Sequence, residues 1–296
     1  MRRTMITTIL AAILGATGAI AAPPLDPAAD LPAAIYTDPP HDTASPARME
    51  VLHIPSGGVA INGVAYVAAG KGPHPTLVLL HGLPGNEKNL DLAQAVRRAG
   101  WTVITFNYRG SWGSPGLYSF VHTGEDADAV LDFVHRPEVI AKLGIDPARI
   151  VIGGHSLGGW VTARTAAHRK DLAGAILISA ADMAAIADRP RPEAIAMMAD
   201  NMESLQGVTP ETMTDEIARN AAAFRLADTA KGLARTPLLV LSSDDGLAPG
   251  TDNLIALTRA AGNGRVTAVH ADTDHGWSDR RVGLQSAVIR WLEALR

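Results

Sequence analysis

The sequence predicts an α/β fold: a mostly parallel sheet of eight strands, with helices on both faces and a helical cap insert. Three observations carry this prediction. From Met49 onward, short apolar runs alternate with runs of helical periodicity, as in a doubly wound sheet. The chain has 296 residues and 47% hydrophobic residues, enough for one large domain. One interval of about 55 residues is longer than a crossover helix needs, which predicts the insert.

Each strand and helix is predicted from the period of its apolar residues. The predicted strands cover residues 49–54, 64–68, 76–80, 102–106, 150–153, 175–179, 238–241 and 266–270. The predicted helices cover residues 87–99, 124–135, 157–169, 253–261 and 280–295. The first two strands are close enough for a hairpin, whereas helices separate the later ones, as parallel crossovers require.

The N-terminus has the features of a secretory signal peptide over residues 1–21. Two arginines precede an apolar run over residues 5–16, and a small-x-small site at residues 19–21 predicts cleavage before Ala22. The apolar run is short for a membrane span. We therefore expect an exported protein, periplasmic or secreted, with no integral membrane span after cleavage. The alternative is an uncleaved N-terminal anchor.

The rest of the chain divides by composition. Residues 22–48 are rich in proline, alanine and aspartate, which predicts an extended arm outside the core. Residues 49–296 form the predicted domain, and residues 181–236 form its cap insert. The insert contains five methionines, and methionine suits an adaptable apolar pocket. For any single methionine, packing of the insert against the main domain is the simpler interpretation.

Charge and composition exclude several function classes. The net charge is −4, so no basic excess favours nucleic acid as a partner. The chain has no cysteine, which excludes disulfides, thiolate metal sites and a cysteine nucleophile. No H-E-x-x-H motif occurs, and we expect neither a metal nor an organic cofactor.

The most informative motif is Gly154-His155-Ser156-Leu157-Gly158, between a predicted buried strand and a predicted helix. A serine with glycines at −2 and +2 in this context is typical of a nucleophile elbow. The turn is so tight that side chains at the flanking positions would clash, and glycine avoids the clash. Ser156 is therefore the candidate nucleophile. The alternative is a serine that caps a helix in a glycine-rich turn.

A serine nucleophile needs a histidine base and a carboxylate that orients the histidine. Three histidines follow Ser156. His168 lies late in the helix after the serine, and His270 ends a predicted strand. His275 lies in the loop between the last strand and the last helix, from which its ring can reach Ser156. We therefore predict His275 as the base.

The candidate carboxylates follow the predicted strand over residues 238–241. Asp244 and Asp245 stand side by side in the turn after this strand. Both are placed to reach His275, so the residues alone leave both open. The one that does not bind the histidine would form a turn or cap a helix.

The candidate oxyanion hole needs two N–H donors aimed at the developing negative charge. One is the backbone N–H of Leu157, directly after the nucleophile. The other is the backbone N–H of Leu83, in the loop His81-Gly82-Leu83-Pro84-Gly85 after the third strand. His81 could act as a base, but we interpret it as a brace for this turn.

The loop over residues 107–114 is the last candidate part of the site. Its glycines and aromatic residues suit a loop that packs beneath residues 81–85, which we call the oxyanion loop, and lines part of the pocket. An equally good interpretation is a structural loop in which Arg109 pairs with Glu125 or Asp126.

In order and spacing, these motifs resemble the α/β-hydrolase superfamily from about Met49 to Arg296. The motifs that carry the resemblance are His81-Gly82, Asn107-Tyr108-Arg109-Gly110, Gly154-His155-Ser156-Leu157-Gly158, Asp245 and His275-Gly276. The chain is most similar to exported bacterial serine hydrolases of the dienelactone-hydrolase and prolyl-oligopeptidase-like group. It lacks the propeller of true prolyl oligopeptidases and the cysteine nucleophile of true dienelactone hydrolases.

The resemblance implies an α/β-hydrolase fold and a catalytic triad. Related hydrolases commonly have an aspartate four residues before a proline, and Asp245 stands so before Pro249. The implied triad is therefore Ser156, Asp245 and His275, and Asp244 remains the alternative acid. The serine argues against epoxide hydrolases and dehalogenases, which use an aspartate nucleophile.

The predicted function is hydrolysis of a small-molecule carboxylic ester through an acyl-enzyme. Two rivals use the same triad: a peptidase or amidase, and an acyltransferase in which an alcohol accepts the acyl group. A third, from another class, is a non-catalytic module that binds a ligand or partner.

Overall fold

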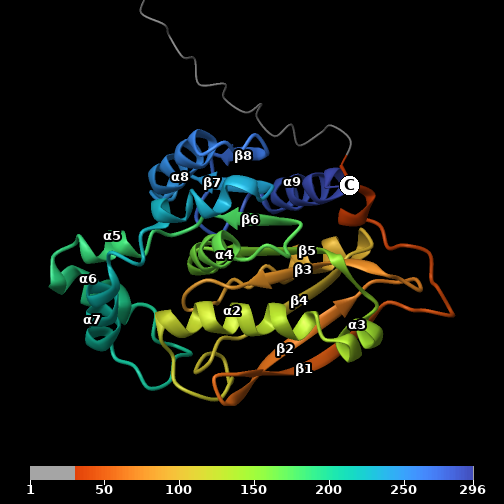
Figure 1. Ribbon diagram of the computed structural model, residues 1–296, viewed down its shortest axis with the longest axis horizontal. Helices are drawn as coiled ribbons and strands as arrows, with labels where there is room; N and C mark the ends of the chain where they lie inside the picture. Colours follow the sequence, from red (N-terminus) through yellow and green to blue (C-terminus); the bar gives the residue numbers. More distant parts are fainter. Residues whose placement is uncertain (1–30, 296) are drawn as a thin grey trace, which may run out of the picture.

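One eight-stranded sheet forms the centre of the protein (Figure 1). We describe a computed structural model that covers residues 31–295; the predicted signal peptide and the first part of the arm lie outside these residues. The strand order is β1-β2-β4-β3-β5-β6-β7-β8. The first two pairs, β1 with β2 and β2 with β4, are antiparallel, and the others are parallel. The strands are β1 (Arg48–Ser56), β2 (Val59–Val67), β3 (His74–Leu80), β4 (Thr102–Phe106), β5 (Ile145–His155), β6 (Gly174–Ile178), β7 (Leu238–Ser243) and β8 (Val266–Ala271).

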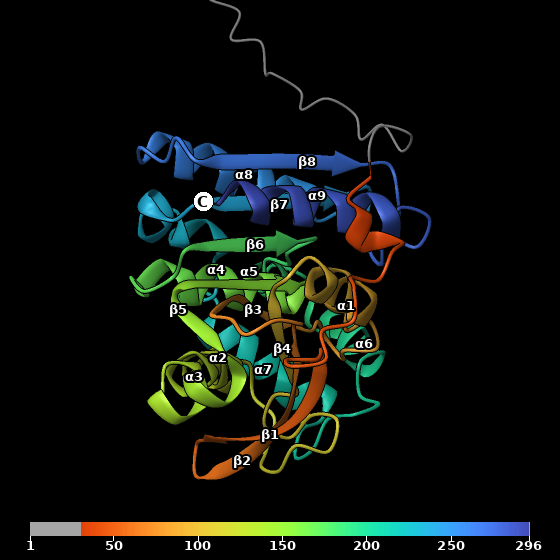
Figure 2. The same ribbon diagram turned by 90° about the vertical axis from the view of Figure 1, so that its right-hand side faces the viewer.

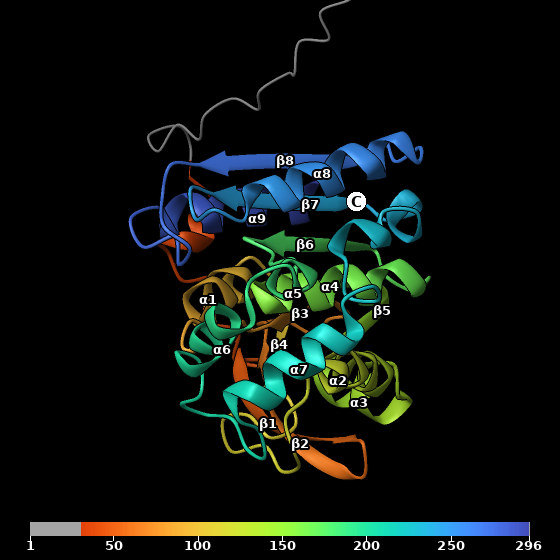
Figure 3. The same cartoon turned by 90° about the vertical axis from the view of Figure 1, so that its left-hand side faces the viewer.

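Helices cover both faces of the sheet because alternate strand residues point to opposite sides. In β3, Val78 and Leu80 belong to one apolar cluster, and Leu77 and Leu79 belong to the other. One face packs against α1 (Leu90–Arg98) and α9 (Arg281–Ala294), seen in front of the sheet in Figure 2. The other face packs against α2 (Phe120–Val134), α3 (Pro137–Leu143), α4 (Leu157–His168) and α8 (Ala248–Ala260), as Figure 3 shows. In residues 31–295, no helix combines the length and apolar character needed to cross a membrane.

The sequence-based helix assignments differ from the observed ones at several places. The helix expected from residue 124 begins at Phe120, directly after the capping residue Ser119. The first helix begins at Leu90 instead of residue 87, because Asn89 has a left-handed backbone (φ +55°). The helix expected from residue 253 begins at Ala248, since its early proline, Pro249, fits the first turn of a helix. Helix α3 was not predicted; its own proline also lies in the first turn.

The predicted cap insert contains three helices: α5 (Ala184–Ala187), α6 (Arg191–Ala199) and α7 (Pro210–Asn220). They form a group on the side of α2 and α4 (Figures 1 and 3). Two 3₁₀ turns, Leu226–Thr229 and Gly232–Arg235, return the chain to β7. Met183, Met198 and Met213 are buried in the same apolar cluster as the sheet. These three methionines therefore pack the insert against the main domain.

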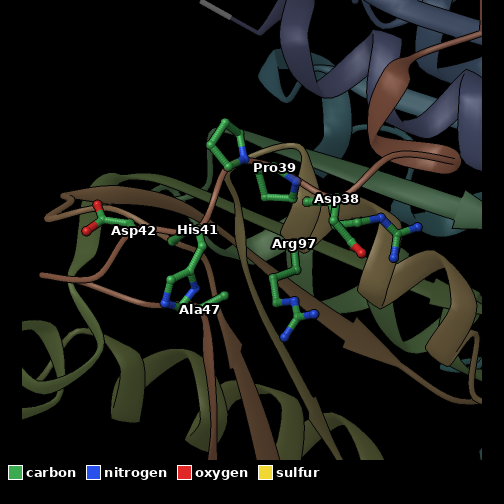
Figure 4. Close-up of a pocket in the computed structure, with 9 residues that line it drawn as sticks. Asp38, Pro39, His41, Asp42, Ala47 and Arg97 are labelled. Atoms are coloured by element: carbon green, nitrogen blue, oxygen red, sulfur yellow. The ribbon is translucent and has the colours of Figure 1, made fainter.

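Hydrogen bonds hold the described part of the arm to the domain at its beginning and near its end. Near its end, the N–H of Gly70 donates to the carbonyl oxygen of Ser45 at 2.8 Å. The guanidinium of Arg98, at the end of α1, donates to the carbonyl oxygens of Ala34 (2.6 Å) and Ile35 (3.0 Å). Beyond this turn, a pocket of about 370 Å³ separates the arm from α1 (Figure 4). Its lining includes Asp38, Pro39, His41, Asp42 and Arg97. The arm is thus held at its short turn and near its end, and the residues between these contacts lie outside the apolar core.

Candidate active site

Ser156 lies in a strained turn between β5 and α4. Its backbone φ is +57°, a left-handed value that costs a residue with a side chain about 1–3 kcal/mol. Its N–H donates to the carbonyl oxygen of Ile178 in β6 at 2.9 Å. A Cβ on Gly154 would lie 2.3 Å from the carbonyl oxygen of Gly158, and one on Gly158 would lie 2.5 Å from that of Leu80. The two flanking glycines are therefore required by backbone contacts.

His275 and Asp245 form a hydrogen-bonded pair. The distance between His275 Nδ1 and Asp245 Oδ2 is 2.7 Å. The other carboxylate oxygen accepts from the N–H of Leu247 at 2.9 Å. Only 3% of the Asp245 side chain is exposed, against 42% for His275. Burial alone would raise the pKa of Asp245, but the hydrogen bonds from His275 and Leu247 outweigh it and hold this pKa at about 2.

The other candidate side chains pair away from this site. Asp244 accepts from His270 Nε2 at 3.0 Å on the surface. His168 binds Asp128 at 3.0 Å, also at an exposed position. The structure therefore brings Asp245, and not Asp244, to His275. In the part of the chain that the structure describes, no three histidine or acidic side chains converge as a metal site would require.

His155 connects the His275 loop, residues 272–280 between β8 and α9, to β5, the strand that ends directly before Ser156. Its Nε2 lies 2.8 Å from the carbonyl oxygen of His275, and the two rings are 4.6 Å apart. Burial and, to a lesser extent, the neighbouring His275 lower the pKa of His155 to about 4. The ring is therefore neutral near pH 7, and Nε2–H donates to the carbonyl. The Ser156 hydroxyl itself has no hydrogen-bond partner within residues 31–295. Sequence reasoning gave His155 no role, because the motif specifies only the glycines and the serine.

The two predicted oxyanion donors lie at the ends of β3 and β5. Within residues 31–295, neither the N–H of Leu83 nor that of Leu157 donates a hydrogen bond to the chain. A Cβ on Gly82 would lie 3.0 Å from the Cβ of Ser156, so the oxyanion loop touches the serine there. The free N–H of Leu157 begins α4, where the helix dipole favours negative charge.

His81 braces the oxyanion loop. Its Nδ1 lies 2.8 Å from the carbonyl oxygen of Gly82, and its own carbonyl oxygen accepts from the Tyr108 hydroxyl at 3.3 Å. Burial lowers its pKa to about 4. A Cβ on Gly85 would lie 2.3 Å from His81 Nδ1, and Gly85 has a φ of +97°, so this turn needs a glycine. The ring therefore fixes the shape of the loop.

The loop over residues 107–114 joins the oxyanion loop to the insert. Arg109 pairs with Asp126 (2.6 Å) and Glu125 (2.5 Å), so the structural brace is present. The Trp112 indole N–H donates to the carbonyl oxygen of Pro84 at 2.7 Å, and the Trp112 N–H donates to that of Ser204 at 3.1 Å. The insert thus meets the oxyanion loop through Trp112.

A second contact holds the His275 loop from the side of α9. Arg281 donates to the carbonyl oxygen of Gly276 at 3.0 Å. The same guanidinium binds the carboxylate of Asp91 and, at 3.0 Å, the side-chain oxygen of Asn89. Arg281 therefore ties the loop to the start of α1, the helix that follows the oxyanion loop.

Comparisons with known proteins agree with this architecture. The alpha/beta hydrolase family profile matches residues 77–291. An uncharacterized protein of Mycobacterium tuberculosis is 29% identical over 132 residues, which span 44% of this chain and 45% of that relative. The 2,6-dihydroxy-pseudo-oxynicotine hydrolase is similar in structure, with a TM-score of 0.64, 21% identity, and coverage of 85% of this chain and 68% of that one. A hyperthermophilic esterase of the archaeon Pyrobaculum calidifontis has a TM-score of 0.65, 20% identity, and coverage of 85% and 87%. At these identities the likeness to the solved structures concerns the fold.

Proposed function

Because the chain belongs to the alpha/beta hydrolase family, we propose that it is a serine hydrolase that cleaves carboxylic esters through an acyl-enzyme. One observation carries the proposal: a hydrogen-bonded acid–base pair is tied to the residue that precedes a serine in a strained elbow. His275 binds Asp245 at 2.7 Å, and its backbone binds His155, the residue directly before Ser156. Serine, histidine and aspartate in this relation are the parts of a nucleophilic triad.

The hydrogen bond to Asp245 assigns the proton on the His275 ring. Nδ1 carries the hydrogen that the carboxylate accepts, so the neutral ring keeps Nε2 free as a base. In the proposed reaction, Nε2 takes the Ser156 proton as the serine oxygen attacks the ester carbonyl. The ionised Asp245 stabilises the imidazolium that forms.

The free N–H groups of Leu83 and Leu157 would hold the negative oxygen of the tetrahedral intermediate. His275 would then give its proton to the leaving alcohol, and an acyl group would remain on Ser156. Water, deprotonated by His275, would attack this acyl-enzyme and release the acid. Every bond that forms or breaks belongs to the substrate, the water, the serine or the Nε2–H of His275, which carries the transferred proton in each step.

Two rival functions use the same residues and differ in substrate. A peptidase or amidase would cleave anilides as well as esters. An acyltransferase would pass the acyl group to an added alcohol, and the ester product would reveal it. A non-catalytic binding module would leave Ser156 unreactive toward a serine-directed phosphonate.

The direct test is hydrolysis of p-nitrophenyl esters from acetate to decanoate by the wild type and by Ser156→Ala. We expect the variant to lose about 10³-fold or more in kcat, because only the oxyanion hole and substrate binding then remain. A matched control is Ser286→Ala, which removes a buried hydroxyl from α9 and should leave the rate unchanged.

Equal rates in the wild type and Ser156→Ala would contradict the proposal. Phosphonate labelling without ester hydrolysis would keep the serine hydrolase and move the substrate to amides or to a narrower ester class. Failure of both labelling and hydrolysis in the folded protein would favour the binding module.

A further inference from the structure

Three buried polar side chains lie beneath the candidate triad and outside its motifs. They are Ser179 directly after β6, Ser243 at the end of β7, and Trp277 in the His275 loop. None is more than 1% exposed. Buried polar groups of this kind need partners, and these three find one another.

The three side chains form a chain of hydrogen bonds. The Trp277 indole nitrogen lies 3.1 Å from Ser179 Oγ, and Ser179 Oγ lies 2.9 Å from Ser243 Oγ. An indole N–H can only donate, so Ser179 accepts from Trp277 and can pass its own hydrogen to Ser243. Ser243 stands two residues before Asp245, and its side chain contributes to the lowered pKa of that carboxyl.

Ser179 also lies next to the groups that hold the nucleophile. The carbonyl oxygen of Ile178 accepts from the N–H of Ser156 at 2.9 Å, and the N–H of Ala181 donates to the Ser156 carbonyl oxygen at 3.1 Å. The N–H of Ser179 itself donates to Leu241 in β7 at 2.8 Å. One residue therefore meets the chain segments that carry the serine, the acid and, through Trp277, the base.

The backbone at two of these positions is unusual. Ser179 has φ +42° and Trp277 has φ +60°, although neither is a glycine. Left-handed backbone at residues with side chains persists only where the surroundings over-determine it, and it clusters at functional sites. A glycine would relieve the strain at either position but would remove the hydrogen-bonding side chain. The sequence therefore keeps the side chain at a cost in strain.

We propose that the Trp277–Ser179–Ser243 chain is a positioning device, which fixes Asp245 and the His275 loop relative to the Ser156 elbow. This inference rests on the proposed function. The three residues do not touch the substrate, so they act through Asp245 and His275. They would affect the rate of the chemical step more than substrate binding.

The test compares wild type with Ser179→Ala, Ser243→Ala and Trp277→Phe in p-nitrophenyl acetate hydrolysis. Each substitution removes one link and keeps most of the side-chain volume. We expect kcat to fall about tenfold or more with KM nearly unchanged, because a misplacement of about 1 Å can cost ~10²-fold. Rates are expressed per active site, counted by the amplitude of fluorophosphonate labelling, so that lost folding does not count as lost chemistry.

Two further variants separate positioning from general packing. Ser242→Ala is the matched control, because Ser242 is also buried and directly precedes Ser243 in β7, but its hydroxyl binds His270 Nδ1 (3.0 Å) and not the three-residue chain. It should leave kcat unchanged. Ser243→Cys keeps a weak donor of similar size and should recover part of the rate lost in Ser243→Ala. The double variant Ser179→Ala/Trp277→Phe should lose less than the product of the single losses, since both break one chain.

The proposal is overturned if kcat per labelled site is unchanged in the two serine variants, or if Ser242→Ala is as harmful as Ser243→Ala. If Trp277→Phe does not fold, kcat per labelled site in Ser179→Ala and Ser243→Ala tests the proposal. The rate of phosphonate labelling gives an independent reading, because it needs His275 and Ser156 but no particular ester. A wild type that is not labelled contradicts the proposed function, whereas a labelled wild type with unaffected variants contradicts only this inference.

Discussion

Two neighbouring aspartates at the end of β7 each bind a histidine, and only one of the two carboxylates is buried. Asp244 binds His270 at 3.0 Å, with 59% and 51% of the two side chains exposed. Asp245 binds His275 at 2.7 Å, and only 3% of its side chain is exposed. In composition the pairs are identical. They differ in how much water and how many other donors reach the carboxylate.

This difference decides what each pair can do. An exposed ion pair gains little, since water and salt screen it. The Asp245 carboxylate also accepts from the N–H of Leu247, so it stays ionised despite burial and fixes one tautomer of His275. A buried, ionised carboxylate stabilises an imidazolium more strongly than an exposed one can. The exposed pair of Asp244 and His270 is therefore an internal control for the candidate site at Asp245 and His275.

The largest expected effect comes from removing the histidines. His275→Ala should reduce kcat toward p-nitrophenyl acetate by at least about 10⁴-fold. The loss should approach ~10⁶-fold if the three triad residues act as a unit. His270→Ala should leave kcat nearly unchanged, because its ring faces solvent. Similar losses in both variants would end the distinction between the two pairs.

A smaller loss is expected from the aspartates. Asp245→Asn keeps the shape of the side chain but cannot hold the required tautomer, and such a change costs about 10⁴-fold in kcat. Asp244→Asn should retain wild-type kcat. If Asp244→Asn were the inactive variant, the assignment of the acid would move to Asp244. Phosphonate labelling of both variants would show whether the serine is still activated.

Local features of the sequence were sufficient to predict the fold. The mostly parallel eight-stranded sheet and membership of the α/β-hydrolase superfamily are confirmed; the dienelactone-hydrolase-like group stays a prediction. The tight turn at Ser156 could be predicted from Gly154 and Gly158, because backbone contacts there leave no room for a Cβ at either position. The start of α1 could not, since it depends on the left-handed backbone of Asn89.

The surroundings of the candidate site depend on contacts between distant segments. Their place after β7 leaves both Asp244 and Asp245 open, and only the family resemblance, through the spacing to Pro249, favours Asp245. The exit of the chain from β7 separates the two carboxylates in the structure. Ser179, Ser243 and Trp277 come from three segments up to 98 residues apart, and a lone serine after a strand has no distinctive signal. His155 likewise gains its role from a loop 120 residues away. Such partners follow from tertiary packing and not from local pattern.

The smallest expected effect is on stability as a function of pH. The pKa of Asp245 falls from its ordinary 3.8 to about 2 on folding. A carboxyl whose pKa is lowered on folding stabilises the folded state fully above its unfolded pKa, and this stability is lost as the pH falls through the folded value. A shift of this size corresponds to about 2 kcal/mol. The gap in unfolding free energy between wild type and Asp245→Asn should therefore narrow by up to that amount from pH 6 toward pH 2.

Urea unfolding of both variants at several pH values measures this effect. The difference in unfolding free energy between wild type and Asp244→Asn should stay below about 1 kcal/mol, as expected for an exposed pair. This difference should vanish in molar salt, where the screening length is short. The corresponding difference for Asp245→Asn should change little with salt concentration, because protein surrounds the carboxylate. Equal pH and salt dependence in the two variants would mean that burial does not distinguish the pairs, and the reason for placing the acid at Asp245 would be reduced to its distance from His275.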